Sequence, residues 1–161
     1  MIQVRTWCRA DLGGGTLDIW PLGLLHPGAR TINVALDLPV EVRLRSRASG
    51  FEVIQGGERL TSETLSALAA SPGTSLVAAV AEAEAMTPFS VEIATGSPRG
   101  AGLGASSALA VALLAAAEAQ RAGRLTRTAA ERAAVARDLE ARLMGLPTGL
   151  QDHFPAQLGG V

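Results

Sequence analysis

The residues with the clearest chemical potential form a run rich in glycine and serine at 96–107, GSPRGAGLGASS. The alternating segment 89–95 predicts a strand before this run, and an Ala/Leu-rich segment to about Ala122 predicts a long helix after it. Glycines let the backbone approach a ligand, and a helix start presents free N–H groups and the positive end of its dipole. The hydroxyls of Ser106 and Ser107 can reach a phosphate oxygen or a magnesium ion. The run therefore predicts a phosphate-binding loop.

Several loops of this kind have to be distinguished. An ordinary turn with a helix cap needs fewer glycines and serines than this run contains. Gly100-x-Gly102-x-x-Ala105 fits the dinucleotide-binding pattern, but that fold needs an acidic residue on a strand about 20 residues later, and 120–143 reads as helix. A Walker A loop is excluded, because all 14 basic residues are Arg and no Gly-Lys-Ser/Thr exists. A different ATP-phosphate loop is the best interpretation.

The loop resembles the P-x-G-x-G-L-G-S-S-A phosphate loop of the GHMP kinases, the family of galactokinase, homoserine kinase, mevalonate kinase and phosphomevalonate kinase. The resemblance implies that the chain binds ATP and Mg²⁺ and has a fold similar to the second domain of ribosomal protein S5. It implies that the following residues hold the nucleotide phosphates: Pro98, Gly100, Gly102, Leu103, Gly104, Ala105, Ser106 and Ser107.

The segment 9–18, RADLGGGTLD, resembles the first motif of the same family and is closest to the sugar-kinase branch that includes heptose-phosphate kinases and fucokinase. The resemblance implies that Arg9 lies near the reacting hydroxyl and that Asp18 contacts a sugar. A carboxylate on a glycine-rich turn can accept hydrogen bonds from two adjacent sugar hydroxyls. The alternatives are a surface charge at Arg9 and a solvated turn carboxylate at Asp18. The other residues implied at the substrate are Gly14, Gly15 and Thr16.

The segment 149–153, GLQDH, resembles the G-x-Q-D-Q run of the sugar-kinase branch. The resemblance implies that Asp152 accepts the proton of the attacking hydroxyl, while His153 replaces the family Gln and leaves the role of that position open. It also implies that Glu140 binds magnesium together with Ser107, a small ligand set of the kind that Mg²⁺ prefers. The alternatives are a helix N-cap at Asp152 and a solvated surface charge at Glu140.

Three weaker candidates could line a sugar pocket, and these are Trp20, His26 and Asn33. Trp20 follows an apolar residue and could instead pack in the core. His26 lies in a loop signature, and two histidines so far apart in the sequence do not make a metal site.

The elements that position these residues follow from hydrophobic periodicity and turn residues. Strands are predicted at 2–8, 31–36, 40–47, 51–55 and 89–95, with a glycine-rich turn at 11–16 and a tight turn at Gly56-Gly57. Besides the long helix after the loop, helices are predicted at 62–70, 75–86 and 127–144, the last with Thr126 as N-cap and Gly145 at its end. This order predicts an α+β fold with a mostly antiparallel sheet covered by helices on one side.

The composition limits the class of protein. A chain of 161 residues with 48% hydrophobic and 18% charged residues is enough for one globular domain. The net charge of -1 argues against nucleic acid as a partner. Cys8 is the only cysteine, so no internal disulfide can form, and a buried thiol is the expected state. With no signal peptide and no apolar segment of bilayer length, we expect a cytoplasmic protein without a membrane partner.

Together these features predict a kinase that transfers the γ-phosphoryl group of ATP to a sugar or sugar phosphate. Residues 1–161 would form its N-terminal ATP-binding domain, and the resemblance implies a second domain after Val161, so the ending LGGV is typical of a truncated protein. Such a fragment could be inactive alone, or two copies could pair through the surface that the second domain would cover. The alternatives are a sensor that binds sugar and nucleotide without turnover, and an RNA-contacting module.

Overall fold

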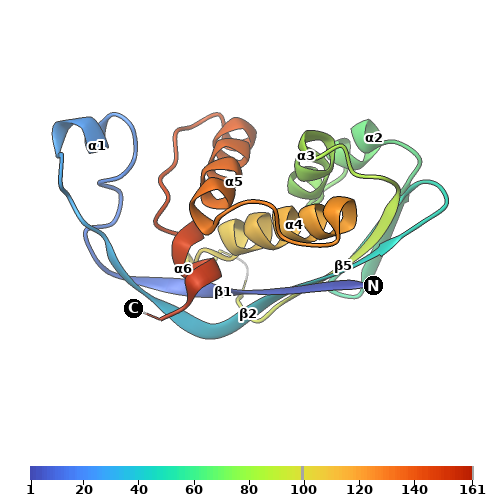
Figure 1. Ribbon diagram of the computed structural model, residues 1–161, viewed down its shortest axis with the longest axis horizontal. Coiled ribbons are helices and arrows are strands. Elements are labelled where there is room, and N and C mark those ends of the chain that lie inside the picture. The colour runs from blue at the N-terminus through green and yellow to red at the C-terminus, as the bar shows by residue number, and fades with distance from the viewer. Residues whose placement is uncertain (99, 161) are drawn as a thin grey trace.

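The computed structural model describes residues 1–98 and 100–160, so that Arg99 within the glycine-rich run and the terminal Val161 lie outside the description. A five-stranded sheet carries helices on one side (Figure 1). The strands are β1 (Ile2–Gly13), β2 (Ile32–Ser46), β3 (Phe51–Gln55), β4 (Glu58–Ser62) and β5 (Phe89–Thr95). The helices are α1 (Leu22–Leu25), α2 (Leu65–Ala70), α3 (Ser75–Ala83), α4 (Ala105–Ala122), α5 (Ala129–Met144) and α6 (His153–Leu158).

The order of strands in the sheet is β1-β2-β5-β3-β4. Every neighbouring pair is antiparallel except β3 and β5, which run parallel. This architecture confirms the predicted α+β class and the mostly antiparallel sheet covered by helices.

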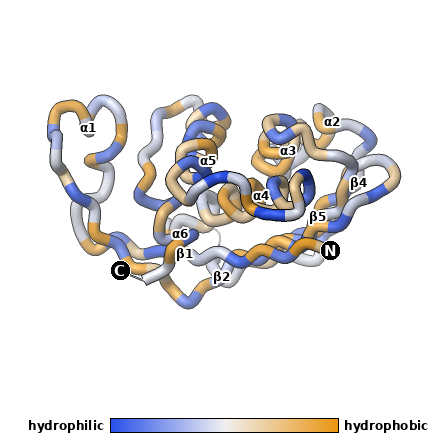
Figure 2. The backbone as a smooth tube through the Cα atoms, in the orientation of Figure 1, coloured by the Kyte–Doolittle hydropathy of each residue, from blue (hydrophilic) through white to orange (hydrophobic). Residues whose placement is uncertain are grey.

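The core lies between the sheet and α4, whose many alanines allow the helix to pack closely on β1 and β2. Apolar residues concentrate along α4 and the strands beneath it (Figure 2). Val40, Val42 and Leu44 alternate into this core as their spacing predicts. Cys8 is fully buried, which confirms the expected state, and burial raises the pKa of its thiol.

Several element boundaries differ from the prediction. Segments 31–36 and 40–47 fall almost entirely within the single strand β2, which continues through Pro39. Pro39 pairs with Trp7, and the register with β1 shifts beside it, between Trp7 and Arg9. Strand β1 continues to Gly13, so the predicted turn at 11–16 begins inside a strand. The predicted helix at 62–70 begins only at Leu65, since the residues before it pair with β3 as β4.

The N-cap of α5 was also predicted wrongly. Thr128 occupies that position and forms a reciprocal capping box with Glu131. Thr126 instead donates its backbone N–H to the buried carboxylate of Glu118, so its hydroxyl does not cap the helix. The short helices α1 and α6 were not predicted, because four and six residues are too few to show a helical period.

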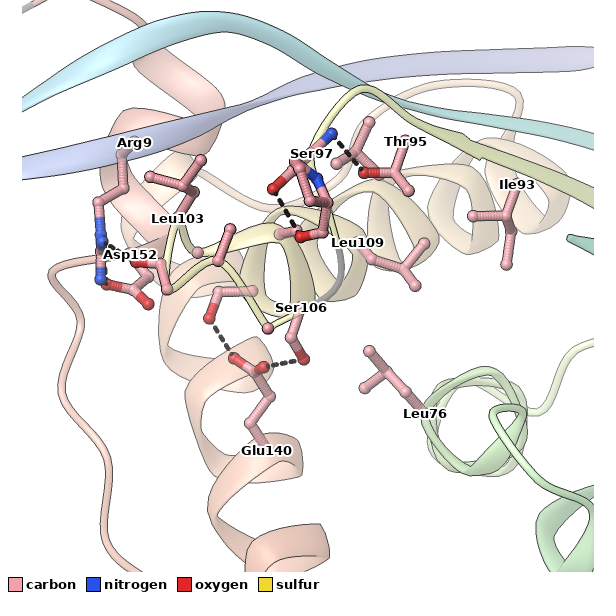
Figure 3. A pocket seen from close by; sticks show the side chains of 18 of the residues that line it. Arg9, Leu76, Ile93, Thr95, Ser97, Leu103, Ser106, Leu109, Glu140 and Asp152 are labelled. Carbon is pink, nitrogen blue, oxygen red and sulfur yellow. Dashed lines mark hydrogen bonds and ion pairs between the residues drawn. The ribbon is translucent and has the colours of Figure 1, made fainter. Parts of the chain in front are cut away.

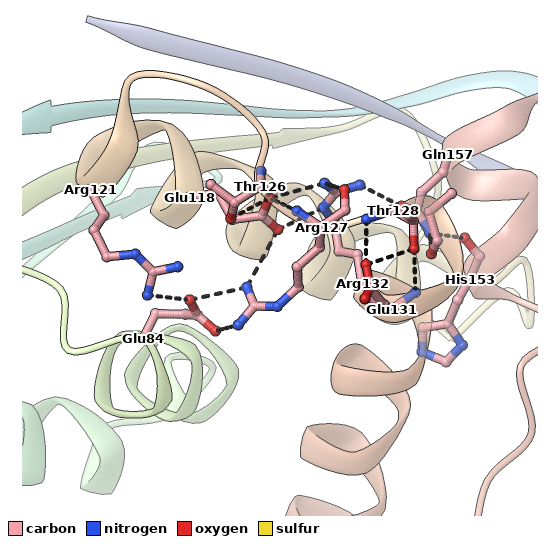
Figure 4. A network of polar contacts seen from close by, with 11 residues as sticks. Glu84, Glu118, Arg121, Thr126, Arg127, Thr128, Glu131, Arg132, His153 and Gln157 are labelled. Atoms are coloured by element: carbon pink, nitrogen blue, oxygen red, sulfur yellow. Dashed lines mark hydrogen bonds and ion pairs between the residues drawn. The ribbon is translucent and has the colours of Figure 1, made fainter.

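A polar network joins α3, α4, α5 and α6 around the C-terminal part of α4 (Figure 4). Its centre is Glu118, fully buried on α4, which accepts hydrogen bonds from Arg132 at 3.0 Å and from the backbone N–H groups of Thr126 and Arg127, just before α5. Arg127 bridges from Glu118 to Glu84, the C-cap residue of α3. Arg132 donates to Gln157 on α6, whose amide donates to the His153 carbonyl. The network therefore fixes α6 against the two long helices.

This network predicts an acid-sensitive part of the stability. Burial alone would raise the pKa of Glu118, but hydrogen bonds from Arg132 and from the backbone of Arg127 and Thr126 outweigh it and lower the pKa from 4.5 to about 2. The folded state then holds fewer protons than the unfolded state, so this stabilisation is present above pH 4.5 and is lost as the pH falls toward 2. We expect wild type to lose about 3 kcal/mol more unfolding free energy than Glu118→Gln between pH 6 and pH 2. Urea titrations across this range measure the difference, and parallel pH profiles would contradict the assignment.

Candidate active site

The glycine-rich loop leads from the end of β5 into α4. Gly100, Gly102 and Gly104 have φ values of 75°, 70° and 70°, a left-handed conformation that residues with a Cβ rarely adopt. The first hydrogen bond of α4 runs from Ala108 N to the Gly104 carbonyl, so the N–H groups of the three residues between them precede the helical ladder. Within the described part of the chain these N–H groups have no partner, so the loop presents free donors at the positive end of an 18-residue helix, as an anion site requires.

Both serines of the first turn of α4 point to one carboxylate (Figure 3). Ser106 Oγ donates to Glu140 Oε1 and Ser107 Oγ donates to Glu140 Oε2, each at 2.7 Å. The Glu140 side chain comes from α5 and is only 7% exposed. It is thus not a solvated surface charge, which was the alternative interpretation.

His153 completes this cluster from α6. Its Nε2 lies 2.8 Å from Glu140 Oε2, and the ring is fully buried, with no hydrogen-bond partner for Nδ1 among the described residues. Burial alone would raise the pKa of Glu140, but the hydrogen bonds from His153, Ser106 and Ser107 together lower it. The carboxylate is therefore ionised at neutral pH and held by three donors.

Arg9 and Asp152 meet at the other side of the loop, although one comes from β1 and the other precedes α6 (Figure 3). Arg9 Nε and Nη2 donate to Asp152 Oδ1 at 2.8 and 2.6 Å, and Nη1 donates to the Gly102 carbonyl at 2.8 Å. The Arg9 side chain is 9% exposed, so the interpretation as a surface charge is wrong. Asp152 stands at the N-cap position of α6 but makes no side-chain capping hydrogen bond.

The first motif reaches the turn that carries Asp152. The Asp18 carboxylate accepts hydrogen bonds from the backbone N–H groups of Leu150 and Gln151. The Gln151 side chain accepts in turn from Thr16 N at 2.9 Å. Gly14 and Gly15 lie just before Thr16. Gly14 has a φ of 74°, and its carbonyl accepts a hydrogen bond from the Thr31 hydroxyl.

One cavity of about 580 Å³ contains most of these groups, a volume within the range of small-molecule sites. Its walls include the loop, Glu140, Arg9 and Asp152, and an apolar end is formed by Leu76, Ile93 and Leu109. The structure thus brings together the predicted phosphate, metal and proton-transfer residues. Asp18 and its turn do not line this cavity.

The weaker candidates fall elsewhere. Trp20 is 67% exposed beside α1, so neither the core nor this cavity holds it, and His26 lies in the same exposed lobe. Asn33 contributes differently from what was expected, since its Nδ2 donates to the Gln151 carbonyl at 2.9 Å. Sequence reasoning missed the contact between His153 and Glu140, because nothing in the spacing of the two residues indicates a pair.

Residues 61–160 match the family model described as the GHMP kinases N terminal domain, which covers more than half of the chain. The chain belongs to the GHMP kinases. A search of curated protein sequences finds no match.

Solved structures share the fold of this GHMP kinase domain. A D-glycero-D-manno-heptose 1-phosphate kinase from Bacteriodes thetaiotaomicron matches with a TM-score of 0.86 and 22% identity over 99% of this chain. The mevalonate kinase of Methanococcus jannaschii matches with a TM-score of 0.77 and 15% identity over 98% of this chain. A Lactococcus lactis galactokinase complexed with galactose matches with a TM-score of 0.75 and 14% identity over 94% of this chain. The chain spans 54%, 51% and 40% of these three proteins, about half their length.

Among the described residues, none of the helices combines the length and hydropathy of a bilayer span.

Proposed function

We propose that this GHMP kinase domain binds ATP with Mg²⁺ and serves the transfer of the γ-phosphoryl group to a hydroxyl of a sugar or sugar phosphate. The observation that carries the proposal is the single cavity in which the anion-binding loop, the Ser106–Glu140–Ser107 cluster and the Arg9–Asp152 pair face one another. Phosphoryl transfer needs few covalent steps from the protein and depends mainly on positioning and charge stabilisation.

The residues present fit both a triphosphate and magnesium. Three left-handed glycines leave the loop open to phosphate oxygens, and the start of α4 supplies N–H donors. One ionised carboxylate with two hydroxyls suits Mg²⁺, which binds few protein ligands and keeps several waters. Glu140 and Ser107 would hold the ion, and bound Mg²⁺ neutralises charge on the phosphates. Among the described residues, no group of three or more His, Cys, Asp and Glu side chains could form a denser metal site.

Asp152 is the proposed acceptor of the hydroxyl proton. Arg9 occupies its Oδ1 with two donors, which fixes the plane of the carboxylate. The other oxygen, Oδ2, faces the loop, since a Cβ built on Gly104 would lie 3.4 Å from it. Asp152 can therefore take a proton on Oδ2 beside the phosphate site, while Arg9 stabilises the charge.

The similar solved structures support a sugar as the substrate class, because they include a heptose 1-phosphate kinase and a galactokinase with galactose. They also support a second domain in the complete protein, since this chain spans about half their length. In this proposal residues 1–161 form the ATP-binding domain, and Gly14, Gly15 and Thr16 lie on the side of the sugar.

The test is ADP release with Mg²⁺ and ATP over a panel of heptose 7-phosphate, heptose 1-phosphate, fucose, galactose, mevalonate and homoserine. It is run on residues 1–161 and on the complete protein. We expect the complete protein to phosphorylate one sugar of the panel and to require Mg²⁺.

Turnover on mevalonate or homoserine alone would overturn the sugar assignment but keep the kinase. ATP binding without turnover on any acceptor would favour a sensor, and absence of ATP binding would overturn the proposal altogether.

A further inference from the structure

The Asp18 carboxylate faces the protein backbone. It accepts the N–H groups of Leu150 and Gln151, 132 and 133 residues later in the chain. Asp152 follows immediately, and its carboxylate is the one held by Arg9. We propose that Asp18 is a positioning residue whose Oδ2 locks the turn before Asp152. The inference rests on the proposed function only in the role of Asp152; the lock itself is a statement about the fold.

The lock is reciprocal. While Asp18 accepts from the backbone of the turn 149–151, the Gln151 side chain accepts from the backbone N–H of Thr16. Asn33, on β2, donates to the Gln151 carbonyl and holds the turn from a third direction. Two segments from opposite parts of the sequence thus exchange side-chain-to-backbone hydrogen bonds in both directions. A carboxylate that accepts two backbone N–H groups forms charge-assisted hydrogen bonds, which are stronger than neutral ones.

Gly149 leaves the space that the Asp18 carboxylate occupies. A Cβ built on Gly149 would lie 2.2 Å from Asp18 Oδ1 and 2.4 Å from Cγ and Oδ2. The carboxylate therefore occupies the space that any other side chain at position 149 would need. The φ of Gly149 is not in the left-handed region, so its backbone conformation does not require glycine, and the requirement comes from Asp18.

The lock matters because Asp152 lies at its end. Leu150 and Gln151 connect the locked turn directly to the carboxylate, and the Leu150 carbonyl accepts the N–H of His153 in the first turn of α6. A displacement of a catalytic group by about 1 Å can lower a rate by about 10²-fold. Release of the turn should therefore lower kcat and leave the acceptor KM nearly unchanged, whereas loss of a direct sugar contact would raise KM.

The experiment compares Asp18→Ala, Asp18→Asn and the control Asp37→Ala in the complete protein. Asp37 is an exposed carboxylate on β2. Amide hydrogen exchange at Leu150 and Gln151 reports the lock without reference to activity. We expect both amides to exchange at least about tenfold faster in Asp18→Ala and to be unchanged in Asp37→Ala. Asp18→Asn should be intermediate, because its amide oxygen can still accept at the Oδ2 position.

Steady-state kinetics supply the second readout, with kcat expected to fall about 10- to 100-fold in Asp18→Ala and KM to change less than about threefold. Gly149→Ala should act like Asp18→Ala in an otherwise wild-type chain, since it displaces the carboxylate. In the Asp18→Ala background the added methyl group of Gly149→Ala meets no carboxylate, so this substitution should lower kcat by less than about a further twofold.

Unchanged amide exchange in Asp18→Ala would overturn the proposal, and so would a raised acceptor KM with normal kcat. Additive effects of Asp18→Ala and Gly149→Ala would also overturn it. If the wild-type protein phosphorylates no acceptor, the proposed function fails, while amide exchange and the Gly149 double substitution still decide whether the lock exists.

Discussion

Asp152→Asn is expected to lower kcat by about 10³-fold while ATP affinity stays within about threefold of wild type. The amide keeps an oxygen for Arg9, so the site geometry survives. It cannot accept the hydroxyl proton, and general-base catalysis contributes about 10²- to 10⁴-fold. Single-turnover kinetics with the best acceptor measure the loss, and calorimetric titration with a non-hydrolysable ATP analogue measures the affinity.

The matched control is Asp138→Asn, an exposed carboxylate on α5 that pairs with Arg137. Its kcat should stay within about twofold of wild type. A loss of nucleotide affinity greater than about tenfold in Asp152→Asn would show that Asp152 supports the phosphate site and would contradict its role as the base.

The second large effect is expected at Glu140. Glu140→Gln replaces an ionised, buried carboxylate that two serine hydroxyls and His153 hold in place. Mg²⁺ depends on negatively charged oxygen ligands. Removal of a group that only hydrogen-bonds to a metal ligand already weakens metal affinity by about 10- to 100-fold. We expect Mn²⁺ affinity in the presence of an ATP analogue, followed by electron paramagnetic resonance, to weaken by about 100-fold.

Because Glu140 is also part of the buried structure, the metal titration is paired with thermal unfolding of the same variant. Glu82→Gln, an exposed position on α3, serves as the control and should match wild type in both measurements. A folded Glu140→Gln protein with wild-type Mn²⁺ affinity would exclude Glu140 as the metal ligand.

Much of the fold could be predicted because its signals are local. Alternation in β2 and β5 and the long apolar period of α4 each lie within one segment, and they gave the α+β class. The boundaries that failed depend on partners elsewhere. Strand β4 exists because it pairs with β3, and Thr126 is drawn from its predicted capping role by a buried carboxylate on α4.

The same division applies to the site. The loop at 100–107 predicts a phosphate site from residue types alone, because three closely spaced glycines and two serines lie where a helix begins. The contact of His153 with Glu140 and the position of Asp18 against the 149–151 turn could not be predicted, because they join segments that only the folded chain brings together. A motif indicates that a carboxylate is available, whereas its hydrogen-bond partners depend on tertiary packing.

The contact between Arg9 and Asp152 has a consequence for how the molecule acquires its shape. The two residues are 143 positions apart, while the glycine-rich loop and the helix behind it are neighbours in sequence. Closing so long a segment of chain costs conformational entropy before any contact is formed, and such distant pairings slow folding. The glycine-rich side of the cavity can form from one contiguous stretch, but the side with Arg9 and Asp152 can form only after synthesis has proceeded past Asp152.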